Sequence, residues 1–346
     1  MSSCGLIPRH RLKWIPTEHR LAHEYCYFLH DESVRLLVEY EKAEAHVVSL
    51  NFASKEEAKL FKKVAKIDSI EALRAISRHD EARRVILNTI TMALVSDCMH
   101  HVYEALQCME KRKSIVAFNL LRKPLMDNLL YLSWMLGDED SFFNNFMEGD
   151  PALLTQKQLG NRRVAIIADA LRQTALSSIF DANFIVDSIF EAKNAQGLYG
   201  VMQHAVHLVT AQRIEVRTAP QNFNFVFKSH ADNDVYDGVY ELLPPLLLYL
   251  AHVVLGLFQR IKPMDEGAKS AFQFRTIHGL SLIGDVDEVR GIQELLTGLL
   301  QSHLSCGHCD APLTVTAHNA ARILLTDSCR CTSCRRAMGL PFSWLF

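Results

Sequence analysis

This chain of 346 residues is 49% apolar and 22% charged, a balance typical of a globular protein with a real core, and its length suits two domains. The formal net charge of −2 argues against a protein that coats nucleic acid by bulk electrostatics, so any basic surface must be local. Five of the nine cysteines lie after residue 305, unlike the spread pairs of a disulfide framework. No apolar run follows the basic residues of the N-terminus, so a secretory signal is not expected and a reducing cytoplasm is the setting indicated.

The first 207 residues show helical periodicity almost throughout. Thr17 is expected to cap a long amphipathic helix that runs towards Leu50. Ser54, with Glu57 three residues on, is a capping-box pattern that opens a second helix. The same pattern recurs at residues 68–71 and opens a helical stretch that reaches about residue 112.

The second helix carries the best basic patch of the helical part. Such stripes are usually solvated faces, although contact with phosphate is the functional alternative. The stripe consists of Lys59, Lys62, Lys63 and Lys66, and it is followed by Arg74, Arg78, Arg83 and Arg84. Earlier in the chain His19 and His23 are four residues apart and could bind a metal, but their charged neighbours favour a solvated face.

Residues 114–136 are apolar almost all round the helix, which is typical of a central, buried helix. The polar side chains of this helix must therefore be paired or lead into a cleft. Arg122 and Asp127 are five residues apart, about 140° round the helix, so each should find its partner on another helix. Pro124 between them removes one backbone hydrogen bond and should kink the helix. The pattern leaves open whether these groups form a structural network or line a catalytic cleft.

His204 and His207, three residues apart, form a second candidate site. They can share one helix face, where a metal-binding or catalytic role competes with ordinary hydrogen bonding. Residues 208–233 alternate in polarity around Pro220 and predict an irregular segment or a short hairpin. Residues 242–258 are apolar but fall short of the ~20 residues that span a bilayer, so a buried helix is favoured over a membrane span.

Two Cys-x-x-Cys knuckles after residue 303 predict a structural zinc ribbon. They are separated by 21 residues, and together they supply the tetrahedral thiolate site that Zn²⁺ prefers. Short strands over 313–316 and 321–325 are expected to form a hairpin between the knuckles. A domain this small folds on the binding energy of its metal. The expected zinc ligands are Cys306, Cys309, Cys331 and Cys334.

A fifth thiol, Cys329, lies two residues before Cys331 and could replace it in the zinc shell. The knuckle spacing to Cys334 favours Cys331. Two domains are therefore expected, a helical bundle over residues 1–303 and a zinc ribbon with an aromatic tail over residues 304–346.

The aromatic tail contains Trp344 and Phe346 and is expected to pack on the helical body or on a protein partner. The chain has no Gly-rich phosphate loop, no His-Glu-x-x-His and no Gly-x-Ser-x-Gly, which argues against the common ATPases, zinc proteases and α/β-hydrolases. The sequence decides neither whether the protein is an enzyme nor its oligomeric state.

Over residues 85–260 the order of these parts resembles a group of uncharacterised bacterial all-helical proteins. In that group a buried helix carries an arginine with an acid five residues on, and a later helix carries a tyrosine and then a histidine. The matching positions here are Arg122, Asp127, Tyr199, and His204 or His207. The group is loosely allied to the HEPN superfamily, whose active members are ribonucleases of defence and toxin systems.

In HEPN nucleases one helix carries Arg-x(4–6)-His, in which the arginine binds phosphate and the histidine assists cleavage. The helix of Arg122 has Asp127 at the matching spacing, which departs from the family pattern and puts cleavage in doubt. Arg74 and His79 do satisfy the spacing on another segment.

The sequence therefore predicts a cytoplasmic, mainly α protein, a multi-helix bundle with a small C-terminal zinc ribbon. The function expected is binding or cleaving RNA or DNA in a stress or defence context. If the protein is a nuclease, its candidate catalytic residues are Arg122, Asp127, His204 and His207. The alternative is a non-enzymatic adaptor or sensor that binds a protein partner, with the aromatic tail as its anchor.

Overall fold

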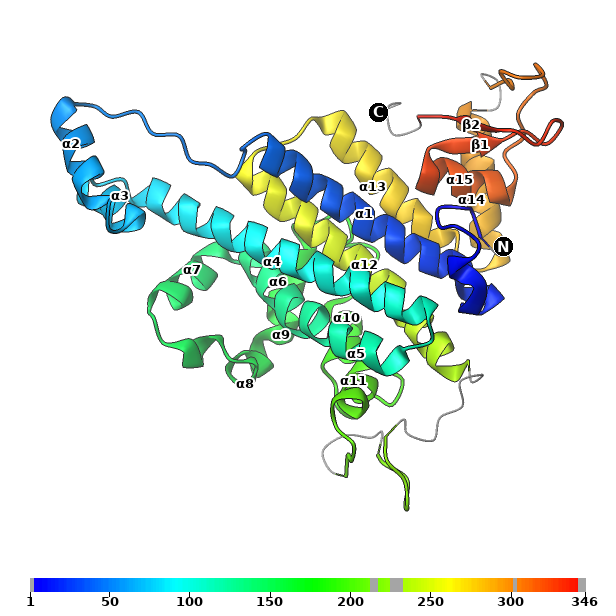
Figure 1. Ribbon diagram of the computed structural model, residues 1–346, viewed down its shortest axis with the longest axis horizontal. Coiled ribbons are helices and arrows are strands. Elements are labelled where there is room, and N and C mark those ends of the chain that lie inside the picture. Colours follow the sequence, from blue (N-terminus) through cyan, green and yellow to red (C-terminus); the bar gives the residue numbers. More distant parts are fainter. Residues whose placement is uncertain (1–2, 212–216, 225–232, 301–303, 342–346) are drawn as a thin grey trace.

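Long helices packed side by side make up the centre of the molecule (Figure 1). The computed structural model describes residues 3–211, 217–224, 233–300 and 304–341, and it confirms the mainly helical fold. The central helix α1 packs against each of the other three long helices. These four helices are α1 (Arg20–Lys42), α4 (His79–Glu110), α12 (Asp234–Ile261) and α13 (Glu266–Ser281).

Helix α12 passes through the core. It approaches α6 (Leu129–Gly137) so closely that a Cβ on Gly256 would lie 2.8 Å from Leu136 Cδ1. By length and composition alone, α12 and α4 could each cross a membrane. In the window that meets this test, 83% of α12 is buried inside the molecule, against 39% of α4. Core packing therefore accounts for the apolar character of α12.

A two-helix arm projects from the end of α4 that lies farthest from the C-terminal elements (Figure 1). It consists of α2 (Lys55–Val64) and α3 (Ser69–Ala75). Both predicted caps are confirmed, because Ser54 Oγ accepts from Glu57 N at 3.0 Å and Asp68 Oδ1 accepts from Ile70 N at 2.7 Å.

Two predicted helix lengths in this region are wrong. The first long helix ends at Lys42 rather than near residue 50, because Glu44 has a positive φ of 49°. The stretch expected to run unbroken from residue 68 to residue 112 is divided at Ser77, whose φ is 61°. A right-handed helix cannot continue through a left-handed residue, so α4 starts afresh at His79.

The kink expected at Pro124 takes the form of a π-helical turn. The segment η3 (Lys123–Asn128) separates α5 (Ser114–Arg122) from α6, and Leu129 N bonds to Pro124 O, five residues back. Because proline has no N–H and clashes with the preceding turn, the helix accommodates it by widening.

Shorter helices cover α6 and α5 on the side away from α1 (Figure 1). They are α7 (Glu139–Met147), η4 (Pro151–Leu154), α8 (Gln156–Leu159), η5 (Gly160–Arg162), α9 (Arg163–Leu171), α10 (Ala182–Ile189) and α11 (Leu198–Val206). The next stretch, predicted to be irregular or a short hairpin, has no strand in its described parts, residues 208–211 and 217–224. Bonds from Thr218 N to Thr210 O at 2.9 Å and from Asn224 N to Leu208 O at 2.8 Å tie it together. The rest of that prediction lies outside the described residues.

The C-terminal elements are α14 (Val286–Leu300), α15 (Ala317–Thr326), β1 (Ser328–Arg330) and β2 (Ala337–Gly339). The hairpin predicted between the knuckles is wrong, because residues 321–325 belong to α15. Thr316 Oγ1 accepts from Asn319 N at 3.2 Å as a helix cap, and Ile323 and Leu324 are fully buried. The observed strands instead flank the second knuckle, with Cys329 opposite Met338.

Helix α15 packs directly on α13 and α14 of the helical body. Arg275 of α13 is 4% exposed and donates from Nε to Leu324 O at 2.7 Å. The same guanidinium pairs with Glu32 of α1 at 3.1 Å and with Asp327 at 3.4 Å. One buried cation therefore joins α1, α13 and the end of α15.

Candidate metal centre and candidate catalytic residues

Four thiols meet at the C-terminal end of the molecule. The sulfur atoms of Cys306, Cys309, Cys331 and Cys334 all lie within 4.8 Å of one another. Two of the Sγ···Sγ distances are 3.6 Å, between Cys306 and Cys334, and 3.7 Å, between Cys309 and Cys331. A tetrahedral Zn²⁺ with Zn–S bonds of about 2.3 Å separates its sulfurs by about 3.8 Å. The four thiols therefore fit a Cys₄ zinc site.

The first knuckle is a tight turn held by its own backbone. Cys306 N donates to Ala311 O at 2.9 Å, and Asp310 N donates to Cys306 O at 2.8 Å. Asp310 follows Cys309 directly and has a left-handed φ of 54°. A bridge between Ser305 and Pro312 closes the base of the turn.

The second knuckle repeats this design. Cys331 N donates to Arg336 O at 2.9 Å, and Arg335, which follows Cys334, has a φ of 61°. Cys334 N also donates to Cys331 Sγ at 3.5 Å, and such N–H···S bonds lower the pKa of the Cys331 thiol. This bond thus favours the thiolate form of Cys331, the form that a metal requires.

Cys329 lies outside the group of four sulfurs. Its side chain is buried, and burial raises the pKa of its thiol. An apolar environment of this kind keeps a cysteine protonated and inert. The geometry therefore favours Cys331 over Cys329 as the third ligand.

The candidate catalytic residues of the central helix lie just before the π-turn and within it. Arg122 ends α5, and Asp127 lies in η3, where Gln156 Nε2 donates to its Oδ1 at 3.0 Å. Each residue is half-buried. The side chain of Arg122 makes no hydrogen bond or ion pair within the described part of the chain.

The main polar network of this helix centres on Asp97 of α4, which sequence reasoning missed. Lys123 Nζ lies 2.9 Å from Asp97 Oδ1, and Asn128 Nδ2 donates to Oδ2 at 2.8 Å. Burial raises the pKa of the Asp97 carboxyl, but the bonds from Asn128 and Lys123 outweigh it and hold the pKa below its ordinary value.

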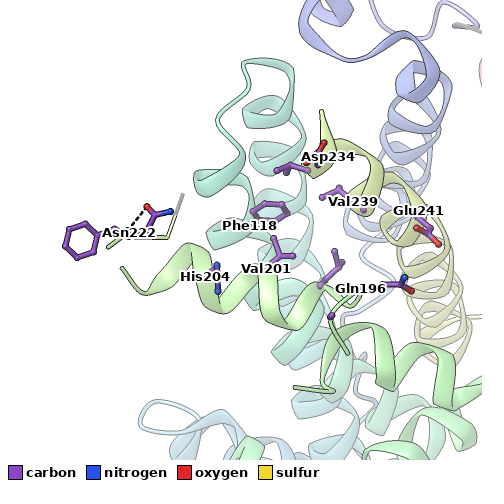
Figure 2. A pocket seen from close by; sticks show the side chains of 13 residues that line it. Phe118, Gln196, Val201, His204, Asn222, Asp234, Val239 and Glu241 are labelled. Atoms are coloured by element: carbon purple, nitrogen blue, oxygen red, sulfur yellow. Dashed lines mark hydrogen bonds between the residues drawn. The ribbon is translucent and has the colours of Figure 1, made fainter. Parts of the chain in front are cut away.

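His204 lines a cavity of about 530 Å³ between α5, α11 and the start of α12 (Figure 2). Asp234 and Glu241 lie on the opposite wall, with Phe118 and Val201 as its apolar floor. Arg122, Asp127 and His207 are not among its lining residues, and His207 lies just beyond α11, exposed. This cavity thus brings together His204 and two carboxylates, not the four residues singled out from the sequence.

The expectation that His23 lies on a solvated face is wrong. His23 is fully buried, with its Nδ1 at 2.6 Å from the Tyr240 hydroxyl and its Nε2 at 3.4 Å from Glu110 Oε1. Arg11 holds the same carboxylate, through Nε at 2.9 Å and Nη2 at 2.6 Å, and Tyr27 donates to it at 2.8 Å. Charged sequence neighbours say little about burial, because successive helix residues point in different directions.

His19 lies near the surface, where its Nε2 is 2.6 Å from Asp237 Oδ1. Glu18 is close enough that the three ligand atoms lie within 4.8 Å of one another. Asp237 is 65% exposed, so the arrangement is that of a surface ion pair.

The arginines in and beside the arm are paired with acids, whereas the lysines of the arm are exposed. Arg74, in the segment that satisfies the HEPN spacing with His79, pairs with Glu71, and Arg78 pairs with Glu57 at 3.3 Å. Arg83 and Arg84 bond to Glu139 of α7 at 3.2 Å and 2.6 Å. Lys59, Lys62, Lys63 and Lys66 are all exposed, and none forms an ion pair with another described residue.

Comparison with known proteins finds no matching family model, no matching curated protein and no matching solved structure. The likeness to the HEPN superfamily therefore stays a prediction from the sequence. The function must be argued from the sites themselves.

Proposed function

We propose that this protein binds nucleic acid through the lysine face of its arm, while a structural zinc ion holds the C-terminal ribbon together. The observation that carries the proposal is the alignment of lysines on α2. At 100° per residue, positions 55, 59 and 62 of α2 fall within about 60° of one another, and position 66 lies in the turn just after the helix ends at Val64. The residues at these positions are Lys55, Lys59, Lys62 and Lys66.

The surroundings of this face support contact with a phosphate backbone. One of the two acids in the first turn of α2 points elsewhere, since Glu57 accepts from Ala53 N and pairs with Arg78 on the far side of the helix. The arm also projects from the helical body (Figure 1), and its lysines are exposed, so a nucleic-acid strand can approach them. Flexible lysines on an exposed helix recognise phosphate as point charges and impose no sequence preference.

The test is fluorescence anisotropy with labelled RNA and DNA across a salt series. Wild-type protein should bind with a steep salt dependence. The variant K55Q/K59Q/K62Q/K66Q should lose most of the affinity, and its log–log salt slope should shrink by about 3, since each lost phosphate contact removes about 0.7–0.9.

The matched control is K111Q/K113Q/K157Q/K193Q, which removes four exposed lysines from other parts of the surface. It has the same net charge as the arm variant and should keep the wild-type slope. An equal loss of affinity in both variants would mean that net charge, and not the lysine face, determines binding. If the wild-type protein does not bind at low salt, the proposal is wrong.

Cleavage is a second candidate function, favoured by the cavity that His204 shares with Asp234 and Glu241. A histidine and two carboxylates that line one cavity are the kinds of group used in general acid–base chemistry. If RNA is the substrate, His204→Asn should abolish cleavage, and the predicted roles of Arg122 and His207 should show as similar losses in Arg122→Gln and His207→Asn. Wild-type cleavage rates in all three variants would contradict the proposed nuclease site, and nucleic-acid binding would then stand as the only proposed activity.

The adaptor function stays as the competing proposal. The arm supports it as well, because Ile67 between α2 and α3 is 92% exposed and Leu60 is 43% exposed. The aromatic tail with Trp344 and Phe346 lies outside the described residues. Deleting residues 341–346 should weaken a protein complex if the tail is its anchor, and an unaffected complex would count against that role.

A further inference from the structure

A basic pocket of about 600 Å³ lies where the N-terminal segment, the start of α1 and the ribbon meet. Its lining contains five basic side chains and no acidic one. The basic residues are Arg9, Arg20, His318, Arg322 and Arg330. They come from four separate parts of the chain, so the pocket exists only when the ribbon is docked.

The arginines of this pocket are not paired directly with acids. Among the residues that the structure describes, none of the four forms an ion pair. Arg20 Nε donates to Ile15 O at 3.2 Å, and Arg330 Nε donates to Arg335 O at 2.8 Å. Both bonds use the inner nitrogen to anchor the side chain, which leaves the terminal NH₂ groups of each guanidinium for a ligand.

Arg322 is the most constrained of the four. Its Nη1 donates to Cys4 O at 2.8 Å and its Nη2 to Ser328 Oγ at 2.7 Å, which joins the N-terminal segment to the ribbon. Its Nε is buried and has no hydrogen-bond partner. Because this atom is buried, Arg322 acts on a ligand in the pocket through its positive charge rather than through Nε.

The carboxylate of Glu24 lies near the pocket, but it is fully occupied by hydrogen bonds from the N-terminal segment. Glu24 is fully buried and accepts from Cys4 N at 2.6 Å, Gly5 N at 3.0 Å and Ile7 N at 3.1 Å, and from Ser3 Oγ at 3.1 Å. These bonds fix the N-terminal segment that carries Arg9. Glu24 therefore shapes the pocket without occupying it.

His318 reports on the charge of the pocket. Burial lowers the pKa of its imidazole, and the positive charges of Arg322 and Arg330 lower it further, against a hydrogen bond with the Ser3 backbone that raises it. A bound anion would offset the guanidinium charges and raise this pKa. The imidazole is thus a built-in probe of occupancy.

We propose that this pocket binds a phosphate group. Several guanidinium forks around a small, mostly polar space match the oxygens of a phosphate, which arginine recognises in bidentate fashion. The volume suits the phosphate of a mononucleotide or the end of a nucleic-acid strand, not a continuous duplex. The pocket is separate from the lysine face of the arm, so either proposal can fail while the other stands.

The test is isothermal titration of the full-length, zinc-loaded protein with inorganic phosphate and pyrophosphate at low salt. Arg9→Gln and Arg322→Gln should each weaken binding about tenfold, the usual loss for one charge-assisted contact. Arg336→Gln removes an exposed charge from the same ribbon outside the pocket, and it should bind as the wild type does. Phosphate should also raise the His318 pKa followed by NMR.

If Arg322→Gln loosens the N-terminal segment, Arg9→Gln decides, because Arg9 is exposed and holds no other described residue. A mononucleotide, a 5′-phosphorylated oligonucleotide and its 5′-hydroxyl form separate the two sources of the phosphate. The proposal is overturned if neither phosphate nor pyrophosphate binds, or if both pocket variants bind as Arg336→Gln does. Neutralising the four arm lysines should leave phosphate binding unchanged.

Discussion

The ionisation of buried side chains in this protein depends on the residues that contact them in the fold rather than on their neighbours in the sequence. Glu110 shows this most clearly. Burial raises the pKa of its carboxyl, but hydrogen bonds from His23, Arg11 and Tyr27 outweigh burial and bring the pKa to about 2. Burial also lowers the pKa of His23, so the imidazole stays neutral beside the carboxylate.

This depressed pKa predicts a loss of stability in acid. The unfolded carboxyl titrates near 4.5 and the folded one near 2, so the stabilisation is fully present above about pH 4.5 and is lost as the pH falls towards 2. Glu110→Gln should be less stable than the wild type at pH 6, and the gap should narrow between pH 4.5 and 3. Urea unfolding of both proteins across this range measures it, and a constant gap would contradict the assigned pKa.

At the scale of helices, two helices can cross closely only where the residue at the crossing is small. Gly279 of α13 lies where α1 and α15 meet it. A Cβ at this position would be 2.6 Å from Tyr25 Cε2 and 3.3 Å from Leu325 Cδ2. The Tyr25 ring cannot easily move aside, because it is fully buried and its hydroxyl donates to Thr276 O at 2.6 Å.

Gly279→Ala should therefore lower the free energy of unfolding by about 1–3 kcal/mol, the usual cost of overpacking. Gly291 of α14 is the matched control, since nothing lies within 4 Å of a Cβ built on it. Gly291→Ala should raise stability by about 0.5–1 kcal/mol through helix propensity alone. Chemical denaturation of the two variants gives the comparison, and similar effects at both positions would refute the steric argument.

The sequence predicts elements well where the signal is local. The caps at Ser54 and Asp68 and the kink at Pro124 depend on neighbouring residues, and the structure has all three. The hairpin expected over 313–325 failed because Thr316 caps a helix and buried apolar residues recur there at helical spacing, a signal that was present. The burial of His23 and the Asp97 network could not be foreseen, since their partners lie far away along the chain.

For the whole molecule, the main feature is that the ribbon is joined to the helical body. Arg275 and Arg322 connect α15 to α13, to α1 and to the N-terminal segment. The expected boundary near residue 304 therefore divides the chain by sequence pattern, while the contacts across it are buried. Metal binding in the ribbon should consequently affect the stability of the body.

Cys331→Ser should lose zinc and lower the melting temperature of the whole protein, because the metal's binding energy stabilises only the folded ribbon. Cys329→Ala is the control, since it removes a thiol two residues away that lies outside the group of four sulfurs. It should keep one zinc ion per chain, as measured by metal analysis after dialysis. Zinc retention in Cys331→Ser together with loss in Cys329→Ala would exchange the two assignments.

The position of α15 between the knuckles has a consequence for how the C-terminal region unfolds when the metal is removed. A zinc ion at the four thiols would join two flanking segments, residues 304–316 and 328–341, whereas the helix between them is held by buried contacts with α13 and α14. Chelation therefore removes the link between the flanks before it removes the helix. A protease added to the metal-stripped protein should cut first on either side of α15 and leave a nicked chain whose central fragment stays bound to the body.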